Sequence, residues 1–200
     1  MKKRALVVVA HPDDETIWMG GAILSLKNID WTIFSLCRGN DQDRAPKFKK
    51  VCVHYNARCL ISDLEDEGIM NIEESLPKIK KRITDTFAGK KFAYIFTHGH
   101  NGEYGHERHL GTHLAVKDLV KNKTITCEKL FFFSYQLDSK KNIVNDTELS
   151  NFAIELSSKE LAKKKNIIEK MYGFSKNSLE SLSYCLPKET FQFHENFDFS

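Results

Sequence analysis

The feature that most constrains the fold is an almost unbroken apolar run at residues 4–10 (RALVVVA), which ends abruptly in the polar segment 11–15 (HPDDE). A continuous apolar run of this length is typical of a strand buried on both faces, as in a parallel sheet covered by helices. In open α/β sheets, ligands bind at the carboxyl ends of the strands. The sequence therefore predicts an α/β fold with a polar site where this first strand ends.

The rest of the chain alternates between short β-branched or aromatic runs and longer segments with a helical period. This alternation predicts a doubly wound, mostly parallel, Rossmann-like sheet with right-handed crossovers and helices on both faces. No repeat or linker interrupts the pattern, so we expect a single domain over residues 1–200, although beyond Asp138 the order of elements is less clear. The expected strands cover 4–10, 31–37, 58–62, 92–97 and 130–135, and the expected helices cover 15–28, a segment beginning at Pro46, 72–87, 107–121 and 157–172.

Composition excludes several classes of function. The chain has 30 basic and 27 acidic residues, a net charge of +3, which is too balanced for a protein that binds nucleic acid through counterion release. No apolar run approaches the roughly 20 residues of a membrane span, and the first one ends too soon for a signal peptide. Five scattered cysteines without a C-x-x-C pair indicate free thiols in a reducing compartment. We therefore expect a cytoplasmic protein.

The polar segment after the first strand places several acids side by side, and a bound cation would relieve their mutual repulsion. His11 and Asp14 could ligate one ion across the turn at Pro12, which would leave Asp13 beside the ion as an unligated carboxylate. Alternatively, the acids only cap the following helix. That alternative explains Asp14 or Glu15 but not His11, and the residues alone leave both interpretations open.

A second polar cluster follows the fourth expected strand, where five of the eight histidines fall within 16 residues. His109 and His113 share one helix face at a spacing of four, and His106 opens the same helix. Histidine is the commonest metal ligand and an effective acid or base near neutral pH. We therefore interpret the cluster as functional, whereas His98, His100 and His113, taken singly, are interpreted as loop or cap residues.

The expected topology brings the two clusters together. In the strand order 3-2-1-4-5 the first and fourth strands are neighbours at the switch point. His11, Asp14 and His109 would then form a three-ligand site with open positions for water. Two nitrogens and one carboxylate suit a catalytic zinc ion, but they also match the facial triad of non-haem iron(II). Calcium and magnesium prefer oxygen ligands and are not expected.

With A-H-P-D-D-E at 10–15 and Y-G-H-E-R-H at 104–109, the chain resembles the PIG-L/LmbE family of zinc-dependent N-deacetylases. This family includes the N-acetylglucosaminyl-phosphatidylinositol, mycothiol-pathway and bacillithiol-pathway deacetylases, and the resemblance covers roughly residues 4–135. It implies one Zn²⁺ per chain, with Fe²⁺ as the alternative, held by His11, Asp14 and His109. Asp13 would be the general base.

The resemblance also implies that His106 and Tyr104 act near the substrate carbonyl, and that Arg44 and Asp66 bind substrate from loops after the second and third strands. Two departures stand out. Relatives often have H-P-D-H where this chain has H-E-R-H, so Arg108 replaces the Asp that would pair with His106 and leaves its charge state open. The Y-x-S-Q element of many relatives survives only partly at 171–175 (MYGFS), in a region that we expect to shape substrate choice.

The sequence thus predicts a hydrolase that removes an acetyl group from an N-acetylated amino sugar or its conjugate, using zinc-bound water and Asp13. Either Asp13 or His106 could protonate the leaving amine. The expected partner is a small molecule, and a homo-oligomer is compatible with the sequence. Three alternatives remain open: an amidase of a larger acyl or thiol conjugate, an iron(II) oxygenase, and a non-catalytic nucleotide-binding module. The last lacks G-x-G-x-x-G after the first strand.

Overall fold

The computed structural model describes residues 2–195, and its centre is a seven-stranded sheet in the order β3-β2-β1-β4-β5-β9-β8. The strands β1 to β5 are mutually parallel, whereas β9 runs antiparallel to both β5 and β8. The expected order 3-2-1-4-5 is therefore confirmed. The strands are β1 (Lys3–Val9), β2 (Ile29–Cys37), β3 (Arg58–Leu64), β4 (Lys91–Thr97), β5 (Thr126–Phe133), β8 (Phe152–Glu155) and β9 (Lys188–His194).

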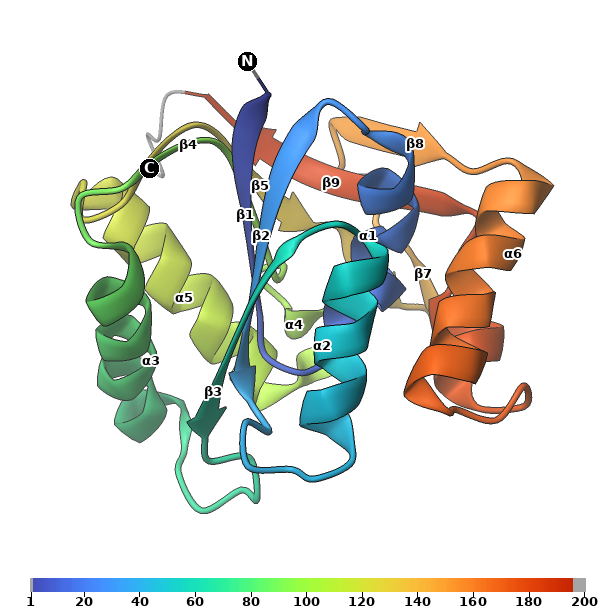
Figure 1. The fold of residues 1–200 in the computed structure, drawn as a ribbon, viewed down its shortest axis with the longest axis horizontal. Helices are drawn as coiled ribbons and strands as arrows, with labels where there is room; N and C mark the ends of the chain where they lie inside the picture. The colour runs from blue at the N-terminus through green and yellow to red at the C-terminus, as the bar shows by residue number, and fades with distance from the viewer. Residues whose placement is uncertain (1, 196–200) are drawn as a thin grey trace.

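Helices cover both faces of this sheet (Figure 1). One face carries α1 (Asp14–Ser25), α2 (Arg44–His54) and α6 (Ser158–Asn166), and the other carries α3 (Ile72–Phe87) and α5 (Glu107–Lys121). Alternate residues of β1 supply the two cores: Val7 and Val9 pack on the α1 side, and Leu6 and Val8 on the α3 side. This confirms a first strand buried on both faces. None of the helices within the described residues is long and apolar enough to cross a membrane.

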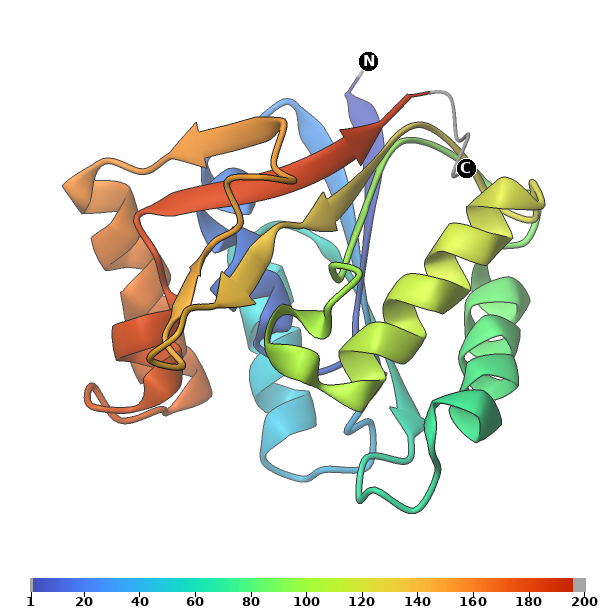
Figure 2. The ribbon, with the colours of Figure 1, turned by 180° about the vertical axis from the view of Figure 1, so that it is seen from behind.

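Smaller elements complete the part of the chain after β4. The short helix α4 (Gly102–Gly105) precedes α5, and a hairpin of β6 (Tyr135–Leu137) and β7 (Ile143–Asn145) follows β5 (Figure 2). Tyr135, expected at the end of the fifth strand, lies instead in β6, where its hydroxyl donates to the carbonyl of Trp18 at 2.7 Å. The expected helix 157–172 is α6 continued by the π-helical turn η1 (Ile167–Tyr172), and a second such turn, η2 (Glu180–Tyr184), precedes β9.

The loops that follow β1, β2, β3 and β4 meet at the carboxyl end of the parallel strands, which is the lower end in Figure 1. The crossovers leave β1 and β4 in opposite directions, so the loops on these two strands open a crevice between them. The polar segment 11–15 and the histidine-rich segment after β4 therefore lie next to each other.

Candidate active site

The turn between β1 and α1 holds Asp13 in an unusual backbone conformation. Its φ is 116°, a region that residues with a side chain rarely adopt and that is found mainly where a site requires it. The carbonyl of Asp13 accepts the N–H groups of Thr16 and Ile17 at 2.9 and 2.8 Å, so its backbone begins the helix. Its carboxylate caps nothing and accepts instead from Arg44 Nη1 at 2.8 Å. A capping role does not explain the side chain of Asp13.

Three donor atoms meet at this turn, two from the turn itself and one from α5. His11 Nδ1 lies 3.2 Å from His109 Nε2 and 3.2 Å from Asp14 Oδ2, and His109 Nε2 lies 3.4 Å from the same oxygen. Ligand atoms about 2.0–2.1 Å from a tetrahedral zinc ion are separated by about 3.3–3.4 Å. The donor set and its spacing therefore fit a divalent metal ion, and we refer to these three side chains as the donor triangle.

Other groupings of metal-binding side chains share members with the donor triangle, and hydrogen bonds already engage ring nitrogens of His98 and His106. The Nε2 atom of His98 accepts the N–H of Ala10 at 3.0 Å, which occupies its lone pair. The Nδ1 atom of His106 accepts the N–H of Arg108 at 3.2 Å, which leaves Nε2 towards the cavity. The groupings are Asp14 with His98 and His109, His11 with His106 and His109, and His11 with Cys37 and Asp66.

Glu103 is a buried carboxylate beneath the donor triangle. One of its oxygens accepts from Nδ1 of His98 at 2.8 Å and from Nδ1 of His109 at 2.6 Å, and the other accepts the Gly99 N–H at 2.7 Å. Burial opposes its ionisation, but the two imidazoles lower the pKa of Glu103 to about 2. Because Nδ1 of His109 is bound in this way, its Nε2 lone pair faces the donor triangle. Sequence reasoning missed Glu103, although an acid within the histidine cluster was the available signal.

Two of the three histidines interpreted as loop or cap residues are buried instead. His98 is fully buried and stacks on His109 with ring centroids 3.9 Å apart. His113 is 5% exposed, and its Nδ1 donates to the carbonyl of His98 at 2.9 Å. The interpretation was wrong for both, because the turn of α4 folds the loop back under α5. His100 is exposed, as a loop residue would be.

The two residues that the family resemblance placed among substrate-binding groups contact other side chains of the site. Asp66 Oδ1 lies 2.9 Å from His11 Nε2, and Asp66 Oδ2 accepts from Nε of Arg38 at 3.0 Å. Arg44 binds Asp13 and lies over the ring of Phe174, 4.4 Å from its centroid. Both line the cavity, as does Arg38, a residue that the sequence did not single out.

The neighbouring aspartates carry opposite pKa shifts. Burial, reinforced by the negative charge of Asp14, raises the pKa of Asp13 well above its ordinary value. Burial also opposes ionisation of Asp14, but the nearby His109 and His98 outweigh it and lower the pKa of Asp14 well below its ordinary value. The two adjacent carboxyls therefore have pKa values driven apart by their different neighbours.

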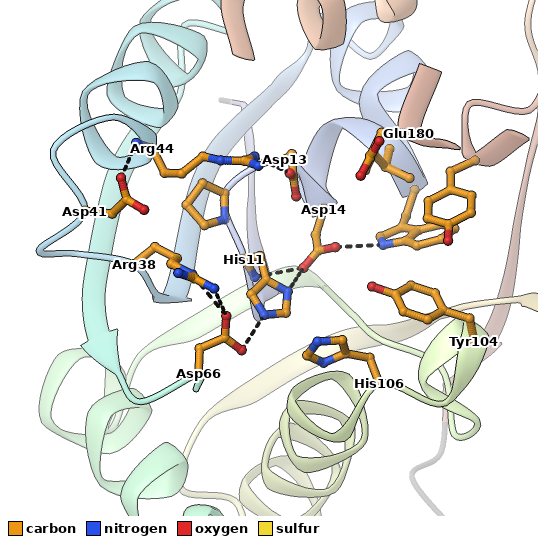
Figure 3. A pocket seen from close by; sticks show the side chains of 14 residues that line it. His11, Asp13, Asp14, Arg38, Asp41, Arg44, Asp66, Tyr104, His106 and Glu180 are labelled. Carbon is orange, nitrogen blue, oxygen red and sulfur yellow. Dashed lines mark hydrogen bonds and ion pairs between the residues drawn. The ribbon is translucent and has the colours of Figure 1, made fainter. Parts of the chain in front are cut away.

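His106 and Tyr104 lie across the cavity from Asp13 (Figure 3). Burial, together with His109 and His11, lowers the pKa of His106 to about 4. The hydroxyl of Tyr104 is directed towards Asp14 and hydrogen-bonds to none of the residues that the structure describes. Both side chains therefore present polar hydrogens to the cavity.

These side chains surround one open cavity of about 520 Å³. An aromatic wall that the sequence did not predict closes one side: Tyr184 of η2 stacks on Trp18 and on Tyr104, with centroids 5.8 and 5.6 Å apart. Glu180 of η2 also lines the cavity, whereas His109 lies behind it, fully buried. Of the predicted site residues, the cavity is lined by His11, Asp13, Asp14, Arg44, Asp66, Tyr104 and His106.

The C-terminal part of the chain packs against residues of the site from η1 and the turn that follows it. The hydroxyl of Tyr172 donates to Glu15 Oε1 at 2.7 Å, and Phe174 lies under the guanidinium of Arg44. Burial raises the pKa of Glu15 to about 7. The partly kept segment 171–175 thus packs against the site through its two aromatic residues.

Comparisons with known structures agree on the fold. The chain is similar to a 4-carboxy-2-hydroxymuconate hydratase from Pseudomonas putida, with a TM-score of 0.66, 15% identity and 96% of each chain covered. It is similar to an N,N'-diacetylchitobiose deacetylase from Pyrococcus horikoshii, with a TM-score of 0.66, 12% identity, and 96% of this chain and 84% of that one covered. A deacetylase of the A40926 pseudoaglycone gives a TM-score of 0.68 at 12% identity, with 98% of each chain covered. At these identities the likeness shows the fold alone.

Comparisons of sequence reach the family. An uncharacterized protein of Acanthamoeba polyphaga mimivirus is 25% identical over 124 residues, which cover 54% of this chain and 54% of that protein. The chain thus spans about half the length of this curated relative. The model of the family described as PIG-L, GlcNAc-PI de-N-acetylase, matches residues 6–120. That range is more than half of the chain and includes both clusters of the site, so this protein belongs to the PIG-L family.

Proposed function

We propose that the protein is a zinc-dependent N-deacetylase, which hydrolyses the acetamido group of an amino sugar or its conjugate to acetate and a free amine. The observation that carries this proposal is the donor triangle of His11, Asp14 and His109. Asp13 lines the same cavity but is not a member of the triangle. A metal site that retains open positions is the kind that supports hydrolysis. In this proposal the donor triangle holds the metal.

A zinc ion bound there would lower the pKa of water from about 15.7 towards about 7 and polarise a carbonyl group. Asp13 takes the proton from the attacking water. Its carboxylate is buried, with a raised pKa, and Arg44 holds one of its oxygens at 2.8 Å, so it stays at a fixed place beside the donor triangle. A base positioned in this way typically contributes about 10²- to 10⁴-fold to the rate.

His106 and Tyr104 stabilise the negative charge that develops on the carbonyl oxygen. Because Nδ1 of His106 accepts a backbone N–H, a neutral imidazole at this position carries its proton on Nε2, which faces the cavity. The ring then donates a hydrogen bond to the oxyanion and has no proton to give to the amine. In this proposal Asp13 therefore returns its proton to the leaving amine, and the hydrogen bond at Nδ1 of His106 supports Asp13 over His106 in that step.

The shape of the cavity supports a sugar as the substrate. The wall formed by Trp18, Tyr104 and Tyr184 offers flat apolar area for one face of a sugar ring. On the opposite side, Arg44 and Asp66 present polar groups to the ring hydroxyls. Small N-acetylated molecules fit a cavity of about 520 Å³.

The test is a screen of N-acetylated sugars, nucleotide sugars and amino-sugar conjugates, in which released acetate is measured with and without added zinc. We expect zinc-dependent acetate release from at least one of them. Release of a longer acid only would favour an amidase of larger acyl or thiol conjugates. Because a hydratase shares the fold, loss of a double bond in an unsaturated acid without any acetate would contradict the proposal. Activity with iron(II) alone, after anaerobic purification, would change the metal but not the reaction.

A further inference from the structure

The family resemblance predicted an Asp at the position of Arg108 that would pair with His106, and the structure places the Arg108 side chain elsewhere. Its side chain is 2% exposed and points away from the cavity, into the loop between β3 and α3. There Nε donates to the carbonyl of Glu65 at 2.8 Å, and Nη2 donates to Glu65 Oε2 at 2.8 Å and to the carbonyl of Met70 at 2.7 Å. One guanidinium therefore ties both ends of the segment 65–70 to α5.

The segment 65–70 is itself folded around the carboxylate of Glu65. One oxygen accepts the N–H groups of Glu67 and Ile69, the latter at 3.1 Å, and the other accepts the Met70 N–H at 3.1 Å. The same second oxygen accepts from Arg108. Since charged groups make the stronger hydrogen bonds, the path of this loop depends on the ion pair between Glu65 and Arg108.

The residue that this loop presents to the site is Asp66. Its Oδ1 lies 2.9 Å from His11 Nε2, and Arg38 holds Oδ2 through Nε and Nη2 at 3.0 and 2.8 Å. A carboxylate bound to Nε2 of an imidazole fixes the ring's orientation and its tautomer, which leaves the Nδ1 lone pair for a metal. Figure 3 shows Asp66 between Arg38 and His11, with the other ring nitrogen of His11 facing Asp14.

We propose that Arg108 is a positioning residue for the metal centre, acting through the Glu65 loop and Asp66 on His11; the proposal rests on the metal site of the proposed function. Arg108 lies on α5 directly before His109, so a single side chain connects the helix that carries one histidine of the donor triangle to the loop that orients the other. Its contacts fix the 3.2 Å separation of the two ligand nitrogens.

The energetics of Arg108 agree with this role. Its Nη1 is buried and has no hydrogen-bond partner among the described residues. A buried ion pair with an unpaired donor contributes little net stability, because desolvation offsets the attraction between the charges. A net gain in stability over an apolar side chain therefore does not account for Arg108, whereas its hold on the loop does.

The experiment measures the zinc affinity of the folded protein by competition with a chromophoric chelator, for wild type, Arg108→Gln, Asp66→Ala and the double variant. Each single change is expected to raise the Kd for zinc about 10- to 100-fold, the range found for residues that orient metal ligands. The Kd of the double variant for zinc should be no higher than the higher of the two single-variant values, since both changes interrupt the same connection. The visible spectrum of the Co²⁺ form should change in all three.

Lys80→Gln is the matched control. Lys80 forms a 2.7 Å ion pair with Asp118 and so also connects the α3 side to α5, but away from the site. It should leave the Kd for zinc and the Co²⁺ spectrum unchanged. Arg108→Lys keeps the charge but not the planar guanidinium group, so it should bind zinc more tightly than Arg108→Gln and less tightly than wild type. If Arg108→Gln does not fold, Glu65→Gln breaks the same ion pair from its more exposed end.

A Kd for Arg108→Gln, or for Glu65→Gln, within twofold of wild type would overturn the inference. So would losses that multiply in the double variant, because they would show independent effects. If the wild type binds zinc and the variants lose affinity as described, but no acetylated compound is hydrolysed, the inference stands and the proposed function fails. A wild type that binds no zinc overturns both.

Discussion

Nδ1 of His11 and Nε2 of His109 lie 3.2 Å apart, although the two residues are 98 positions apart in the chain. The contact follows from topology. β1 and β4 are hydrogen-bonded neighbours, and the loops after them turn over the same edge of the sheet. Glu103 behind His109 and Asp66 behind His11 then orient the two rings towards each other.

Asp13→Asn is expected to lower kcat by about 10²- to 10⁴-fold while the zinc content stays at the wild-type value, because the amide cannot accept the proton of water. Turnover on the best substrate and metal analysis of the same sample check this. Glu180→Gln makes the same carboxylate-to-amide change in the same cavity and should retain most of the turnover. Wild-type turnover in Asp13→Asn would show that another group is the base.

His106→Asn is expected to lower kcat by about 10²- to 10³-fold, the typical loss when one oxyanion donor is removed. Asparagine can still accept the Arg108 N–H at the start of α5, so the helix should keep its cap. Zinc content and Tm should therefore remain close to those of wild type. Unchanged turnover would remove His106 from the reaction.

Glu103→Gln is expected to raise the Kd for zinc about 10- to 100-fold, because the amide loses the negative charge that holds both imidazoles and turns an NH2 group towards the Gly99 N–H, where the carboxylate has an acceptor. Chelator competition measures the change. Glu107→Gln removes an exposed carboxylate four residues later and serves as the control. An equal Kd in Glu103→Gln and Glu107→Gln would mean that the carboxylate does not orient His109.

His113 should make the protein less stable in mild acid. Burial lowers its pKa from an ordinary value of 6.5 to about 4 in the folded state, so the unfolded chain binds the proton more readily between these values. The stabilisation is complete above pH 6.5 and is lost as the pH falls towards 4. Urea unfolding gives the free energy of unfolding at pH 7 and at pH 5. The difference between these two values should be smaller in His113→Gln than in wild type. An equal difference in both proteins would exclude this contribution from His113.

Much of the fold was predictable because the deciding signals are local. Every residue from Ala5 to Ala10 is apolar, and this run indicates a strand buried on both faces. The order of the first five strands follows from the alternation of strand and helix together with the handedness of the crossovers. The antiparallel strands β8 and β9 are different, because Phe152 and Phe191 pair across a long connection that no local pattern indicates.

The part of the site that one short motif supplies was predictable from the sequence. The part that depends on side chains from other segments of the chain was not. His11, Asp13 and Asp14 lie within four consecutive residues, so the motif alone places them together at the end of the first strand. The roles of Glu103 and Arg108 depend on the left-handed turn at Glu103 and on the loop at Glu65, which only the folded chain displays. The burial of His98 under His109 was missed for the same reason.

The most direct test of the account is the number of zinc ions bound per chain, measured by metal analysis after equilibration with zinc and removal of the excess. Wild type and Asp13→Asn are expected to retain one ion, and His11→Ala and His109→Ala none, while all four remain folded by circular dichroism. Retention of one ion by both histidine variants, or its absence from wild type, would contradict a metal held between the end of β1 and the start of α5.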